Sequence, residues 1–257
     1  MAVSLYRSTK SQAKTVVLSS GLGGHAQYWQ SQIPALQQHF HVLTYDQEGV
    51  FPDSHILPDN YSLPAMVVEL QQILEAEKID QCHFIGHALG GFIGLELARL
   101  APCLVEKLVV VNAWDQLDAH TNRCFATRLT LLRQAGVAAY VQAQALFLYP
   151  PAWISTHDQQ LVQQEQHAIA YFAPLENVEK RLAALRQYQP EQTARKVSHS
   201  VLVIANQDDF LVPWQRGLAL SRLIPHADFE LYPIGGHASS VTQADWFNSC
   251  VLQYLYS

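Results

Sequence analysis

The sequence has 257 residues, 49% of them hydrophobic and 15% charged, so the chain can bury a large core and does not have the composition of a disordered protein. It contains no apolar run of about 18 residues, which excludes a membrane-spanning helix. The formal net charge of -6, without a basic cluster, argues against a nucleic-acid partner. An N-terminal segment without a signal-peptide pattern, and four scattered cysteines without a CxxC pair, lead us to expect a reduced, cytoplasmic protein.

Short apolar runs recur along the chain and are typical of buried parallel strands. We expect strands at Thr15–Ser19, Val42–Tyr45, Cys82–Ile85, Lys107–Val111, Ser200–Ile204 and Asp228–Tyr232. Between them lie helical patterns, one running from Ser62 to about Glu77 and another ending at Leu100, before Pro102. Strands that alternate with helices predict an α/β protein with a mostly parallel, doubly wound sheet.

The alternation stops between about residues 113 and 197, where the spacing of apolar residues is helical and no strand pattern occurs. About 80 residues is too long for a single crossover connection. We therefore predict a helical cap over the carboxyl ends of the strands, where ligands bind in open α/β sheets. Residues 1–112 and 198–257 would form the core and residues 113–197 the cap, within one domain.

The segment Gly86-His87-Ala88-Leu89-Gly90 lies between an expected strand and an expected helix. This is the place and the glycine spacing of the nucleophile elbow G-x-S-x-G, in which a strained turn lifts a serine out of the sheet. Ala88 occupies the serine position, and a methyl group cannot attack a carbonyl carbon. The glycines do not match a dinucleotide-binding fingerprint, which needs a glycine where Ala88 stands.

An acid and a histidine follow the elbow in the order that an α/β-hydrolase requires. His237, in Gly235-Gly236-His237, follows an expected strand, and Asp209 follows another. Asp209 is our preferred partner for His237, with Asp208 as the alternative. Either aspartate could instead cap the next helix, and His237 could be an ordinary loop histidine. After the first strand, Ser20-Gly21-Leu22-Gly23-Gly24 predicts an oxyanion hole formed by the backbone N–H groups of Leu22 and Leu89.

These motifs together resemble the α/β-hydrolase family along essentially the whole chain. More narrowly, the sequence is similar to the RutD-type aminoacrylate or carbamate hydrolases of bacterial uracil degradation. The segments that carry the narrower resemblance are Ser20-Gly21-Leu22-Gly23-Gly24, Tyr45-Asp46-Gln47, the elbow, Ala119-His120-Thr121 with Arg123-Cys124-Phe125, Ala143-Gln144 with Leu146-Phe147-Leu148-Tyr149-Pro150, and Gly235-Gly236-His237-Ala238. That family tolerates alanine in the elbow, which favours Ala88 as the natural residue. One departure is Glu48, which stands where the family pattern has arginine and reverses a charge near the expected mouth of the site.

Five further side chains are candidates for contact with a substrate: Ser20, His87, Arg123, Trp114 and Tyr149. Arg123 and Arg128 could bind a carboxylate or carbamate anion, or could form a solvated helix face. Ser20 could contact the substrate or hydrogen-bond its own turn, and His87 could pack beside the elbow. No metal site is expected, because His83 and His87 lie across a strand and a turn rather than on one helix face. No cofactor motif occurs, and the resemblance suggests a homodimer.

The sequence thus predicts an enzyme in which His237, oriented by Asp209, activates water toward a small, labile metabolite such as carbamate or aminoacrylate. Two alternatives stay open. The chain could be a ligand-binding pseudoenzyme with a decayed elbow, or a cofactor-independent lyase that uses the same histidine as a base on carbon.

Overall fold

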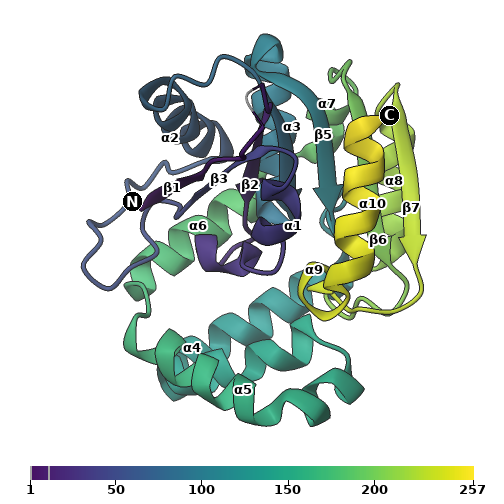
Figure 1. Ribbon diagram of the computed structural model, residues 1–257. Helices are drawn as coiled ribbons and strands as arrows, with labels where there is room; N and C mark the ends of the chain where they lie inside the picture. The colour runs from purple at the N-terminus through teal and green to yellow at the C-terminus, as the bar shows by residue number, and fades with distance from the viewer. Residues whose placement is uncertain (1, 11) are drawn as a thin grey trace.

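The computed structural model describes residues 2–10 and 12–257 and contains one seven-stranded sheet (Figure 1). Its strands are β1 (Val3–Tyr6), β2 (Thr15–Ser19), β3 (His41–Tyr45), β4 (Cys82–His87), β5 (Val105–Val111), β6 (Ser200–Asn206) and β7 (Ala227–Tyr232). They follow the order β1-β3-β2-β4-β5-β6-β7, with β1 antiparallel to β3 and the other neighbouring pairs parallel. Six strands lie where the sequence predicts them. β1 was not predicted, because this short edge strand is partly exposed and has no buried apolar run.

Helices cover both faces of the sheet, as alternating side chains along the strands require. The helices of the described residues are η1 (Ala26–Trp29), α1 (Ile33–Gln37), α2 (Leu63–Ala76), α3 (Leu89–Leu100), η2 (Pro102–Leu104), α4 (Ala119–Leu148), α5 (Pro151–Ala170), α6 (Leu175–Gln187), α7 (Pro190–Ala194), α8 (Trp214–Leu223), α9 (Ser239–Thr242) and α10 (Ala244–Tyr256). On β5, Leu108 and Val110 pack into the cluster that contains α2 and α3, whereas Val109 and Val111 pack against α10. The fold is that of an α/β protein with a doubly wound sheet.

Four consecutive helices, α4 to α7, separate β5 from β6, and α4 and α5 lie away from the sheet in Figure 1. Leu132, Tyr140 and Val141 of α4 form a small apolar cluster of their own, to which Phe172 and Val178 add. The long helix α4 bends at Gly136, whose φ of 87° is a left-handed conformation that glycine adopts without steric cost. Among the described residues, no helix is both long and apolar enough to cross a membrane.

Candidate active site

The turn after β4 has the geometry of a nucleophile elbow. Ala88 joins β4 directly to α3 with φ 48° and ψ -111°, a conformation that non-glycine residues rarely adopt and that is characteristic of strained functional turns. A Cβ atom on Gly86 would lie 2.2 Å from the carbonyl oxygen of Gly90, and one on Gly90 would lie 2.1 Å from that of Ser19. Both glycines are therefore required by the packing of the turn, with or without a serine between them.

His237 and Asp209 are joined by a hydrogen bond of 2.8 Å between Nδ1 and Oδ2, and both side chains are almost fully buried. The other carboxylate oxygen of Asp209 accepts the backbone N–H groups of Leu211 and Val212. Because the carboxylate accepts, Nδ1 of His237 carries a proton, and in the neutral ring Nε2 is then the acceptor. Asp208, the alternative acid, instead accepts the N–H groups of the glycines that precede His237, at 3.0 and 2.8 Å, and so supports the loop.

The backbone of His237 is held by two side chains from neighbouring strand ends. Nε2 of His87 donates to the carbonyl oxygen of His237 at 2.8 Å, and the side-chain amide of Asn112 donates to the same oxygen at 2.7 Å. Burial, and then the neighbouring His237, lower the pKa of His87 well below its ordinary value. His87 is therefore neutral, with an unprotonated Nδ1 that has no protein partner among the described residues.

The loop expected to form the oxyanion hole is braced by a buried arginine that the sequence analysis missed. Arg181, on α6, donates to the carbonyl oxygens of Glu48 and Leu22 and to the side chain of Gln47. Gln47 in turn donates to the carbonyl oxygen of Ser20 at 2.7 Å. These contacts fix the backbone around Leu22, while the side chain of Glu48 points to His55 at 3.9 Å and does not line the cavity described next.

A cavity of about 200 Å³ lies at the carboxyl ends of the strands, and His237, Ala88 and Leu22 all line it. Its lining residues are Ser20, Gly21, Leu22, Gly23, Gly24, His25, Tyr28, His87, Ala88, Leu89, Trp114, Phe125, Arg128, Gln144, Leu148, Leu185, Leu211 and His237. The structure thus brings together most of the residues chosen from the sequence. Three of them do not line the cavity. Arg123 is exposed on α4, Tyr149 packs on Trp153 with ring centroids 4.5 Å apart, and Asp209 reaches the cavity only through His237.

Other residues around the site were not among the candidates chosen from the sequence. Tyr28 stacks on the ring of His87 with centroids 4.7 Å apart, and the carbonyl oxygen of Leu148 accepts the N–H of Ala238. Neither belongs to a motif of fixed spacing. Asn112 had a usable signal, because it follows the strand β5 directly and the carboxyl ends of parallel strands meet at one edge. Within residues 2–10 and 12–257, no three His, Cys, Asp or Glu side chains are arranged to hold a metal ion.

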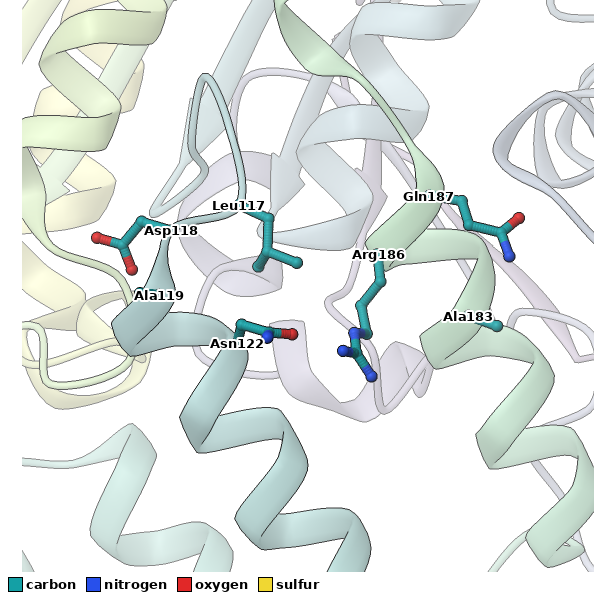
Figure 2. A pocket seen from close by; sticks show the side chains of 7 residues that line it. All are labelled: Leu117, Asp118, Ala119, Asn122, Ala183, Arg186 and Gln187. Atoms are coloured by element: carbon teal, nitrogen blue, oxygen red, sulfur yellow. The ribbon is translucent and has the colours of Figure 1, made fainter.

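A wider surface cleft of about 500 Å³ lies between the start of α4 and the end of α6 (Figure 2). In Figure 2 the side chain of Arg186 extends from α6 toward Asn122 on α4. Asp118, at the rim, accepts the N–H of Thr121 and caps α4. The cleft shares no lining residue with the cavity at the strand ends, so it is separate from the site of His237.

An elbow, an acid and a histidine in this order, at the carboxyl ends of a sheet of this topology, define an α/β-hydrolase. The family model of the alpha/beta hydrolase fold matches residues 14–139. The RutD protein of Acinetobacter baylyi, a carbamate hydrolase by name, is 50% identical, with 99% of this chain and 98% of that protein covered. The RutD protein of Stutzerimonas stutzeri, also a carbamate hydrolase by name, is 46% identical, with 99% of this chain and 96% of that protein covered. The chain therefore belongs to the RutD family of α/β-hydrolases and is a hydrolase.

Solved structures agree with this fold. An enol-lactonase from Burkholderia xenovorans has a TM-score of 0.89 at 21% identity and covers 100% of this chain and 96% of its own. A hydrolase from Pseudomonas aeruginosa has a TM-score of 0.87 at 24% identity, with 99% and 94% covered. At these identities the likeness concerns the fold and not the substrate.

Proposed function

We propose that the protein hydrolyses a small, labile metabolite with a carbon–nitrogen bond, carbamate or aminoacrylate, in pyrimidine degradation, and that no acyl-enzyme forms. The observation that carries the proposal is the 2.8 Å hydrogen bond between His237 and Asp209 beside an elbow whose nucleophile position is Ala88. The names of the relatives, which denote carbamate hydrolases, support this substrate class.

The chemistry requires a base, an oxyanion site and room for water. Nε2 of His237 takes a proton from a water molecule, whose oxygen attacks the carbon that bears nitrogen. The backbone N–H groups of Leu22 and Leu89 stabilise the charge that develops, and the aminoterminal end of α3 adds its dipole. His237 then returns the proton to the nitrogen as the carbon–nitrogen bond breaks and ammonia leaves. Aminoacrylate reacts as its imine tautomer, and there the remaining proton of the ammonia comes from the added hydroxyl group, whose oxygen becomes the carbonyl oxygen.

Ala88 is compatible with this chemistry because the nucleophile is water. The methyl group leaves space where a serine hydroxyl would lie in the cavity. When one member of a catalytic triad is absent, binding and the oxyanion hole still give roughly 10³–10⁴-fold acceleration. That is modest for a stable ester or amide. It is sufficient for a carbamate or an enamine, which decompose in water without help.

His87 has a supporting role in the proposal. Its Nε2–H group fixes the backbone of His237, and its unprotonated Nδ1 is an acceptor beside the loop of Gly21. Location in the cytoplasm and assembly as a homodimer stay predictions from the sequence.

The test is the decay of freshly generated carbamate and aminoacrylate, followed by stopped flow with the wild-type protein and with His237→Ala. We expect acceleration that falls by about 10²-fold or more in the variant. His226→Ala, which removes an exposed histidine, is the matched control and should behave as wild type. Saturable binding without acceleration would favour the ligand-binding alternative. Release of ammonia from aminoacrylate without a carbonyl product, and so without addition of water, would favour the lyase.

A further inference from the structure

Arg128 of α4 places a buried guanidinium group at the cavity, and only 6% of the residue is exposed. Its Nη2 donates to the hydroxyl of Tyr140 at 3.1 Å, and the group lies over the rings of Tyr140 and Phe147, at 5.1 and 5.8 Å from their centroids. Its Nε–H has no hydrogen-bond partner among the described residues. The side chain is thus held firmly, with a donor left free.

No carboxylate of the described chain balances this charge. The residues that line the cavity include no Asp or Glu, and no ion pair within residues 2–10 and 12–257 involves Arg128. Asp209 is engaged through both oxygens with His237 and the backbone. A buried charge is stable in proteins when it is paired or fully hydrogen-bonded, and Arg128 is neither.

Two other arginines show that this arrangement is particular to Arg128. Arg181 is buried even more deeply, but its guanidinium group donates to three oxygen atoms of the chain. Arg186, in the surface cleft of Figure 2, is exposed, so water solvates its charge. Of these three, only Arg128 combines burial, an unpartnered Nε–H and a place in the lining of the cavity that contains His237.

We propose that Arg128 is a carboxylate-binding residue, which holds the anionic end of a short substrate while its carbon–nitrogen group reaches His237. This inference rests on the proposed function and narrows its substrate class. Arginine suits the role because its planar group binds a carboxylate through two parallel hydrogen bonds. The carboxylate of the substrate would pair with the buried positive charge of Arg128, which has no such partner in the described chain.

In this proposal the carboxylate is separate from the reacting carbon. Arg128 comes from α4, whereas Ala88 and His237 follow β4 and β7. The cavity of about 200 Å³ has room for about seven waters, or for a substrate of a few carbon atoms. The imine tautomer of an amino-substituted acrylate can place its carboxylate at Arg128 and its imine carbon at His237. In carbamate the carboxylate carbon is itself the reacting atom. The same carboxylate group would therefore have to bind Arg128 and be attacked beside His237.

The experiment compares acrylate with acrylamide, which has the same shape but no charge. Dissociation constants are measured by NMR titration of each compound with wild-type protein, Arg128→Gln and Arg123→Gln. Arg123→Gln is the matched control, because it removes the same charge from an exposed position of the same helix. We expect acrylate to bind the wild type and the control about thirtyfold or more tightly than Arg128→Gln, and acrylamide to bind all three weakly.

Equal affinity of the wild type for acrylate and acrylamide would overturn the proposal, and this comparison needs no variant. An equal loss in Arg123→Gln would also overturn it, since a general effect of charge would then explain the binding. Tyr140→Phe keeps the charge and removes one hydrogen bond, so we expect a smaller loss than in Arg128→Gln. The same titration with His237→Ala separates the two proposals, because carboxylate binding should persist there although hydrolysis is lost.

Discussion

Restoring the absent nucleophile tests whether His237 is in reach of position 88. The change Ala88→Ser adds one hydroxyl to a residue whose backbone, at φ 48° and ψ -111°, already carries a side chain, so it introduces no new backbone strain. We expect the free energy of unfolding to change by less than about 1 kcal/mol if the hydroxyl donates to His237. An unsatisfied buried hydroxyl would instead cost about 1–3 kcal/mol.

The activity readout is the hydrolysis of p-nitrophenyl acetate, a stable ester that the wild type should hydrolyse poorly. Activation of a serine by a general base is worth about 10²–10⁴-fold, so we expect a gain of about 10²-fold or more with a burst of p-nitrophenol from an acyl-enzyme. The double variant Ala88→Ser with His237→Ala is the control and should show no burst. If the single variant is as stable as the wild type and shows no burst, His237 does not reach position 88. Activation of a water at that position would then be refuted as well.

Three further predictions concern groups around the site. Arg181→Met should lower the free energy of unfolding by about 3 kcal/mol and reduce kcat more than KM, because the loop at Leu22 loses a buried hydrogen-bond donor. Urea unfolding and steady-state kinetics measure the two effects. An unchanged urea midpoint would show that Arg181 does not stabilise the loop. Burial lowers the pKa of His87, so the unfolded chain is protonated first and stability falls as the pH drops below 6.5. In thermal melts His87→Gln should flatten that profile by up to about 1.4 kcal/mol per pH unit, and a profile as steep as that of the wild type would exclude this histidine as the cause. Burial raises the pKa of Glu69 to about 7, a rise that a hydrogen bond from Tyr61 opposes, so wild-type stability declines as the pH rises from 4.5 toward 7. Glu69→Gln should therefore raise Tm near about pH 8 more than near about pH 5, and equal shifts at the two values would show that ionisation is not involved.

The absence of a serine from an otherwise complete elbow has a chemical consequence for the substrate. Gly86 and Gly90 are required by backbone contacts closer than 2.3 Å to any added Cβ atom, so the turn depends on them and not on residue 88. The elbow can thus keep the N–H of Leu89 at the start of α3 whatever side chain precedes it. The proposed chemistry uses the backbone N–H of Leu89. It requires of residue 88 only a side chain small enough to leave room for water.

Much of the fold and of the site was predictable from the amino-acid sequence. Short apolar runs identify six strands, because a strand buried on both faces must be apolar along its length. The spacing of Gly86, Ala88 and Gly90 identifies the elbow, since local sterics allow that turn only with glycines in those places. Chain order identifies Asp209 and His237. A short edge strand such as β1 carries no comparable signal, because two of its four residues are exposed and the other two are only partly buried.

Only the tertiary structure distinguishes residues of the same type that are close in sequence. Asp208 and Asp209 are adjacent, yet one holds the loop and the other holds His237. Arg123 and Arg128 lie on one helix, yet one faces solvent and the other faces the cavity. Arg181 has no motif, and its role arises from carbonyl oxygens more than 130 residues away. Pattern and spacing report local geometry, whereas burial and partnership depend on elements that the chain brings together from distant positions.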